Sequence, residues 1–229
     1  MFSVNLLNLL HLCDPALPVG SFSHSGGLET YTQAGIVHNK ETAGLFTRQQ
    51  LSQNIFYNDA ALLSLAYDAA HRGNMKAIIQ LDEMCSAIKL PLELRTASLK
   101  LGTRLLKIFG SRLACTLVHQ YQQMVKTQAG YGHYCVAFGI IACALQVGKA
   151  EALTGFYYNT AAGFITNTVK LVPLGQQDGQ DLLMDLFPLI ETLVAGTMEP
   201  NLEMIGLCCA AFDIRSMQHE HLYSRLYMS

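Results

Sequence analysis

The chain has 229 residues, of which 51% are hydrophobic and only 14% are charged, compared with a charged share of about 25% in ordinary soluble domains. Its formal net charge of −2 gives no overall positive field to attract a phosphate backbone, so we expect no nucleic-acid partner. A chain of this length buries a large core without metals or disulfides, and its surplus of apolar residues predicts contacts with other proteins.

The predicted elements are all helices. Apolar residues recur at spacings of three and four along nearly the whole chain, and almost no segment alternates with a period of two. After a first helix within residues 1–18, a second is expected to begin near Leu28, with Ser23 or Ser25 as its N-cap. The further predicted helices share this periodicity and cover residues 75–88, 92–109, 113–124, 134–147, 152–172, 178–195 and 202–229.

Local signals refine this pattern. Asn74 is the expected N-cap of a helix that ends before Pro91, and Pro188 is expected to disturb the helix that contains it. Residues 134–147 are apolar on nearly every side, which is typical of a helix packed at the centre. Because no linker or charge run divides the chain, we predict one all-α, bundle-like domain over residues 1–229 around this central helix.

The cysteines and the apolar segments indicate the expected cellular location of the protein. The chain has 7 cysteines, an odd number with no C-x-x-C pair, which is typical of reduced thiols. The N-terminus lacks the basic start and the cleavage site of a secretory signal. The apolar stretch from Tyr134 is too short for a membrane span of about 20 residues. We therefore expect a cytoplasmic protein without membrane contact.

Residues 16–31, ALPVGSFSHSGGLETY, form a loop rich in glycine and serine. A phosphate-binding P-loop needs a lysine after its glycines, and a nucleophile elbow needs G-x-S-x-G after a strand. Neither is present. A turn with a serine cap on the next helix is favoured on physical grounds, and a binding surface is the alternative. The binding residues in that alternative are Phe22, His24 and Tyr31.

Residues 170–188, KLVPLGQQDGQDLLMDLFP, form a second unusual loop. It predicts a helix stop and restart with Asp178 as the cap. Alternatively, its amides dock onto the main chain of a partner. We expect Gly175 to hold a backbone conformation that a β-branched residue cannot reach. The partner-binding residues in this loop are Pro173, Gly175, Gln176, Gly179 and Gln180.

The third unusual stretch is the C-terminal segment DIRSMQHEHLYSRLYMS. His219 and His221 are two residues apart and point to different faces of a helix, which disfavours a shared metal ion. Tyrosine, leucine and arginine at a chain end are instead typical of an interface. Deletion from Met217 onward is therefore expected to leave a folded protein that has lost a partner. The interface residues are His219, Glu220, Tyr223, Arg225, Leu226 and Tyr227.

No catalytic triad, carboxylate pair or metal-ligand cluster stands out in the sequence, so we predict no catalytic residues, no metal ligands and no cofactor. Five segments, in this order, do resemble the UreF family of urease accessory proteins. Lys170 stands where such proteins often have arginine, and Tyr227 where phenylalanine is common. The segments are DPALPVGSFSHSGGLETY, ELRTASLKLGTRLLK, HYCVAFGIIACAL, NTAAGFITNTVKLVPLGQQDGQ and HEHLYSRLYMS.

This resemblance implies an all-helical, non-enzymatic protein that forms a homodimer. It would join a UreD/UreH-type scaffold protein and a UreG-type GTPase in inserting nickel into apo-urease, with its C-terminal segment docked into the scaffold. Nickel would pass through the assembly. Two alternatives stay open: a regulator of the partner GTPase in which Arg225 reaches the γ-phosphate, and a helical metalloenzyme built on His and Cys residues, which their spacing disfavours.

Overall fold

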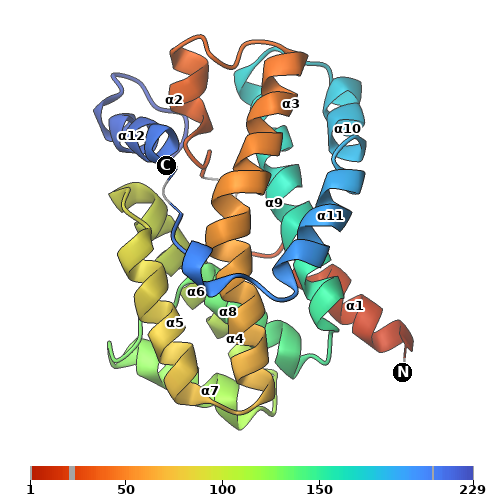
Figure 1. Cartoon of the computed structure of the whole chain (residues 1–229), viewed down its shortest axis with the longest axis vertical. Helices are drawn as coiled ribbons and strands as arrows, with labels where there is room; N and C mark the ends of the chain where they lie inside the picture. Colours follow the sequence, from red (N-terminus) through yellow and green to blue (C-terminus); the bar gives the residue numbers. More distant parts are fainter. Residues whose placement is uncertain (1, 21–23, 208, 229) are drawn as a thin grey trace.

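The computed structural model describes residues 2–20, 24–207 and 209–228, and every regular element within these ranges is a helix (Figure 1). The predicted all-α class is confirmed. The α-helices, in chain order, are α1 (Phe2–Leu12), α2 (Leu28–Gln33), α3 (Lys40–Gln49), α4 (Ala61–His71), α5 (Met75–Ile88), α6 (Leu92–Gly110), α7 (Thr116–Lys126), α8 (Tyr134–Ala144), α9 (Lys149–Leu171), α10 (Gln176–Met184), α11 (Phe187–Thr197) and α12 (Ala210–Gln218).

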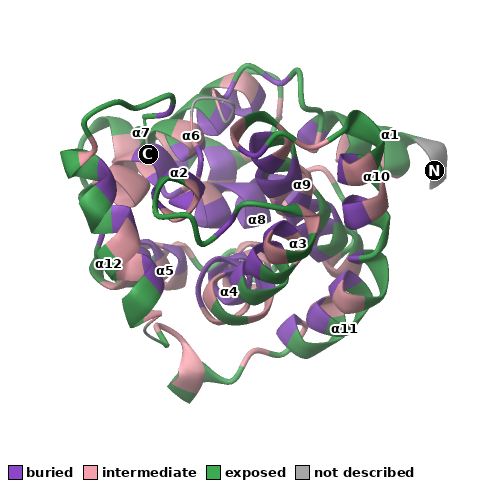
Figure 2. Ribbon diagram, turned by 90° about the horizontal axis from the view of Figure 1, so that it is seen from above, coloured by how far each residue is buried: buried purple, intermediate pink, exposed green. Residues whose placement is uncertain are grey.

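Helix α8 is the predicted central helix, and its residues 135–142 are all buried (Figure 2). It packs mainly against α4 and α6. Gly139 permits the close approach to α4, because a β-carbon at this position would lie 2.6 Å from the carbonyl oxygen of Leu63. The apolar surroundings on all sides explain why no polar face is needed.

Helix α9 organises the other half of the core. Helices α1, α2, α3, α10 and α11 all pack against it. Phe164 of α9 meets the ring of Phe46 from α3 at a centroid distance of 5.7 Å. One continuous set of buried apolar side chains connects this half with the surroundings of α8. No helix in the described part of the chain is both long and apolar enough to cross a bilayer.

Local sequence signals set several helix ends. The Asn74 side chain accepts a hydrogen bond from the Ala77 amide at 3.1 Å, so the predicted N-cap of α5 is confirmed. Pro91 directly precedes α6 and has extended backbone angles, as its ring and its missing N–H require. Between α3 and α4 the chain forms a π-helix, Gln50–Ala60, which the sequence periodicity did not predict.

Two of the predicted helices are wrong in extent. The 178–195 helix is divided into α10 and α11, because Pro188 lies in the first turn of α11, where its missing N–H costs no hydrogen bond. The predicted 202–229 helix consists of a short 3-10 turn η3 (Leu202–Met204), α12, a second 3-10 turn η4 (His219–His221) and a non-helical end. Gly206, whose φ is +84°, lies between η3 and α12 and interrupts the predicted helix there.

Candidate functional site

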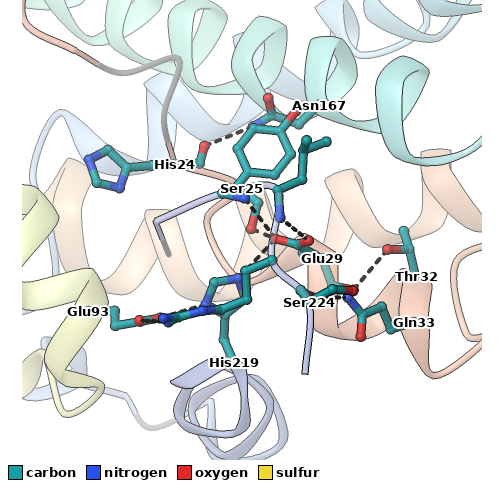
Figure 3. A network of polar contacts seen from close by, with 12 residues as sticks. His24, Ser25, Glu29, Thr32, Gln33, Glu93, Asn167, His219 and Ser224 are labelled. Atoms are coloured by element: carbon teal, nitrogen blue, oxygen red, sulfur yellow. Dashed lines mark hydrogen bonds and ion pairs between the residues drawn. The ribbon is translucent and has the colours of Figure 1, made fainter. Parts of the chain in front are cut away.

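The chain end, residues 222–228, folds back onto the body of the protein, and we call it the C-terminal tail. Glu29 in the first turn of α2 accepts hydrogen bonds from the backbone N–H groups of Leu226 at 2.7 Å and Tyr227 at 3.1 Å. The Gln33 side chain donates to the carbonyl oxygen of Ser224 at 3.0 Å (Figure 3). The conformation of the tail is therefore fixed through its backbone.

His219 is the centre of this arrangement (Figure 3). Its Nε2 lies 3.0 Å from Glu29 Oε2, and its Nδ1 lies 2.6 Å from Glu93 Oε2. Each ring nitrogen therefore lies within hydrogen-bond distance of a carboxylate oxygen. The side chains of His219 and Glu29 are 1% and 4% exposed, so this contact is buried.

Arg225 completes the network, because its Nη1 lies 2.7 Å from the other carboxylate oxygen of Glu93. We call Glu29, Glu93, His219 and Arg225 the tail latch. Glu93 thus contacts both His219 and Arg225, and the backbone amides of Leu226 and Tyr227 satisfy lone pairs of the buried Glu29 carboxylate, as a buried polar group requires. The latch joins α2, α6 and the chain end.

The first loop supports the same site. The N-cap of α2 is Gly27 with φ +83°, so the predicted serine N-cap is wrong. Ser25 lies two residues earlier, and its hydroxyl accepts a hydrogen bond from the Glu29 amide at 3.4 Å. The carbonyl oxygen of His24 accepts one from the Asn167 side chain at 2.9 Å. These bonds fix the loop between α9 and the latch. Ser23 and Phe22 lie outside the described residues.

A pocket of about 420 Å³ lies beside the latch. Burial lowers the pKa of His24 on its rim, nearby Lys100 and Arg104 lower it further, and Glu93 opposes them. The pocket is thus lined by charges of both signs, with Lys100 and Arg225 opposite in sign to Glu93 and Glu220. Its lining residues are His24, Leu92, Glu93, Thr96, Ala97, Lys100, Glu220, Arg225 and Met228.

The latch divides the predicted tail residues into two groups. His219 and Tyr227 are buried, and Arg225 is held by Glu93. Glu220 is exposed, Leu226 is 68% exposed, and Tyr223 projects fully into solvent. Large apolar side chains that are exposed on an ordered backbone are typical of a protein-binding surface.

Comparison with known proteins decides the family. A sequence model of the UreF family matches residues 37–187. The urease accessory protein UreF of Haemophilus influenzae (strain PittEE) is 48% identical over 221 residues, which cover 96% of this chain and 94% of that protein. The chain belongs to the UreF family of urease accessory proteins. UreF proteins of Actinobacillus pleuropneumoniae serotype 5b (46% identical over 221 residues, covering 96% of this chain and 97% of that protein) and Lachnoclostridium phytofermentans (34% over 231 residues, covering 98% of each) are also similar.

The second loop of this UreF-family chain is separate from the latch, since Figure 1 places α10 and α12 on opposite sides of α3. Asp178 accepts a hydrogen bond from the Gly175 amide at 3.3 Å, so it caps the helix from its third position. Gly175 itself has φ −66°, which any residue adopts, and the expectation of a special backbone conformation there is wrong. Pro173, Gly175, Gln176 and Gln180 are exposed.

Gly179 is buried for a different reason. A β-carbon at this position would lie 2.8 Å from Cγ2 of Val169, so the glycine allows α10 to approach α9 closely. On the exposed side, Lys40 forms ion pairs with Asp178 at 2.9 Å and Asp181 at 3.0 Å. The loop is therefore a rigid helix start with exposed amides.

Tyr31, which the sequence suggested as an interface anchor, packs inward instead of standing free. It is half-buried, and its ring lies 5.1 Å from that of Phe46. Burial raises the pKa of its hydroxyl. The residue therefore supports the docking of α2 on α3.

Sequence reasoning missed Glu29 and Glu93. Both lie in the first turn of a helix, where an acidic residue is ordinary because it complements the helix dipole. The one available signal was the position of Glu29 directly after two glycines and Leu28. In the part of the chain that the structure describes, no three His, Cys, Asp or Glu side chains are arranged so as to hold a metal ion.

Proposed function

We propose that this chain is a non-catalytic urease maturation factor of the cytoplasm. It bridges a UreD/UreH-type scaffold protein and a UreG-type GTPase during GTP-dependent delivery of nickel to apo-urease. Membership of the UreF family supports the role in urease maturation. The single observation that carries the finer proposal is the C-terminal tail, which is ordered by the latch and turns Tyr223 and Leu226 outward.

The tail suits docking into a scaffold protein. A binding segment that is already ordered loses less conformational entropy when it binds, and the latch provides this order without using the exposed side chains. Tyrosine is among the residues that supply much of the energy in protein interfaces, and an exposed leucine beside it adds apolar area to be buried. We assign the scaffold contact to Tyr223, Leu226 and Glu220, with His219, Arg225 and Tyr227 holding the tail in position.

The exposed amides at the start of α10 are assigned to a second partner. Gln176 and Gln180 donate and accept hydrogen bonds without a charge to desolvate, and Pro173 and Gly175 beside them leave the backbone accessible. Gly179 supports this surface from behind through its contact with α9. We propose that this surface, or the one around Phe22, His24 and Tyr31, meets the GTPase.

Exposed apolar side chains on another face support a homodimer. They lie on α9 and on α1, α10 and α11, which all pack against α9. The rings of Tyr158 and Phe187 lie 6.3 Å apart within this face. We propose that the face is covered by a second copy of the chain. Its large exposed residues are Val4, Leu6, Leu7, Leu10, Tyr158, Met184 and Phe187.

The alternative in which Arg225 acts as an arginine finger on the GTPase has less support. Its guanidinium is already bound to Glu93 at 2.7 Å, and a finger would have to leave this carboxylate and open the latch. We therefore assign Arg225 to the order of the tail.

Reconstitution of urease maturation tests the proposal. Apo-urease, the scaffold protein and the GTPase are incubated with Ni²⁺ and GTP, with and without this chain. We expect urease activity to rise at least tenfold only when the chain is present, and no GTP hydrolysis by the chain alone. Equal activation in its absence, or hydrolysis of GTP by the isolated chain, would contradict the proposal.

A further inference from the structure

The charges of this chain are strongly separated along the sequence. Residues 94–150 contain 7 of the 15 Lys and Arg residues and none of the 17 Asp and Glu residues. The segment carries a formal charge of +7, while the rest of the chain, with 8 basic and 17 acidic residues, carries −9. The net charge of −2 therefore conceals a basic region that comprises most of α6, α7, α8 and their connections.

Part of this region forms an ordered surface. Lys100, Arg104 and Lys107 are all exposed, and their positions on α6 fall within an arc of about 60° and a rise of about 10 Å. We call these three residues the α6 basic row. None of them forms an ion pair with a carboxylate of the described residues, in contrast to Lys40, Lys89 and Lys149 elsewhere.

The first loop fixes the middle of the row. Arg104 donates a hydrogen bond from Nη1 to the carbonyl oxygen of Val19 at 3.0 Å, which positions its guanidinium. His24 lies close enough to Lys100 and Arg104 for their charges to lower its pKa, in addition to the effect of burial. The positive potential is thus concentrated along one edge of α6.

We infer that the α6 basic row is a docking surface for an acidic helix of a partner protein. Carboxylates spaced i, i+4 and i+7 on a helix that lies along α6 would match the three cations one by one. Thr103, the exposed residue directly before Arg104, is small, so a helix can approach the row closely. This inference goes beyond the proposed function and does not depend on it.

The surroundings favour protein over other polyanions. Nucleic acid needs a long positive track, whereas Glu93 lies in the first turn of α6 and the rest of the chain is acidic. Base stacking needs exposed aromatic rings, and the one aromatic residue of α6, Phe109, is buried. A membrane surface would need large apolar side chains along the row, and Leu92 at the start of α6 is exposed but lies outside the row.

The test uses a synthetic helical peptide with glutamate at i, i+4 and i+7, and a second peptide of the same composition in scrambled order. Binding to the full chain is measured by fluorescence anisotropy at low and at physiological salt. We expect the unaltered chain to bind the patterned peptide at least tenfold more tightly than the scrambled one. The double variant Lys100→Glu/Lys107→Glu is expected to bind the patterned peptide at least tenfold more weakly than the unaltered chain.

The matched control is Arg72→Glu/Lys76→Glu, which makes the same change in charge at exposed residues just after α4 and in the first turn of α5. This control is expected to bind within twofold of the unaltered chain, and circular dichroism should show both variants folded. An equal loss of affinity in the control would show that the overall charge alone determines binding, and would overturn the inference. Tighter binding of duplex DNA or of phosphatidylserine vesicles through the row, measured in parallel, would also overturn it.

Discussion

His219 and Glu29 form a buried contact with 3.0 Å between Nε2 and Oε2, although 190 residues separate them in the sequence. The pair joins the chain end to the first turn of α2. Because the same Glu29 carboxylate also accepts the Leu226 and Tyr227 amides, one side chain determines how the tail is presented. The pair therefore connects the fold directly with the proposed docking function.

The substitution Glu29→Gln tests this connection. Removing the carboxylate charge leaves His219 with one carboxylate partner and weakens the bonds from the tail amides, and a hydrogen bond to a charged group contributes about 1.5–3 kcal/mol. We expect the free energy of unfolding in urea to fall by a few kcal/mol, and hydrogen exchange at the Leu226 and Tyr227 amides to speed up at least tenfold. Glu41→Gln, at an exposed position in the first turn of α3, is the control and should change neither quantity.

The pKa of His24 gives a prediction about pH. Burial and the charges of Lys100 and Arg104 lower this pKa from 6.5, so the folded state binds fewer protons than the unfolded state between the lowered pKa and 6.5. The contribution of His24 to stability is therefore lost as the pH falls through this window. Titration of the ring by NMR should show a pKa below 6.5 that rises in Lys100→Gln. A pKa at or above 6.5 would show that the positive edge of α6 is absent.

The two glycines of the second loop are expected to behave differently. Gly179→Val places side-chain atoms against Val169 and should reduce stability by about 1–3 kcal/mol, as overpacking does. Gly175→Ala, at φ −66°, should change stability by less than about 0.5 kcal/mol. Thermal unfolding of the two variants measures the difference. If Gly175→Ala were the more damaging, the contact between α9 and α10 would not be the reason for the glycine.

Tyr31→Ala is expected to weaken the fold as well as any assembly. The half-buried ring contacts Phe46 at a centroid distance of 5.1 Å, and loss of such an aromatic contact together with its buried area costs about 1–3 kcal/mol. Urea unfolding would show this cost. Unchanged stability would contradict this packing role of the ring.

The sequence predicted the features that depend on local chemistry. The all-round apolar pattern of 134–147 identified α8, and the Asn74 side chain identified the start of α5. A glycine in the sequence does not distinguish a positive φ from close helix packing, so the special conformation expected at Gly175 was wrong and the packing role of Gly179 was not predicted. The tail could not be predicted, because its shape depends on Glu29 and Glu93, which are far away in the sequence.

The structure also changes the design of a deletion. Removal of residues from Met217 onward takes away His219 and Arg225, and leaves the buried Glu29 and the half-buried Glu93 without their side-chain partners in the tail. A truncation that begins at Leu222 keeps His219 but still removes the bonds from Leu226 and Tyr227 to Glu29. Substitution of exposed tail residues is therefore a cleaner test of docking than either truncation.

The most direct test is the affinity of Tyr223→Ala/Leu226→Ala for a purified UreD/UreH-type scaffold protein, measured by isothermal titration calorimetry. Tyr223 is fully exposed and Leu226 is 68% exposed, so the substitutions should leave the free energy of unfolding unchanged. The control is Leu90→Ala/Tyr131→Ala, which removes the same residue types at 51% and 49% exposure elsewhere. We expect the tail variant to bind at least tenfold more weakly and the control to bind like the unaltered chain, whereas unaltered affinity of the tail variant would contradict the assignment of the tail as the docking segment.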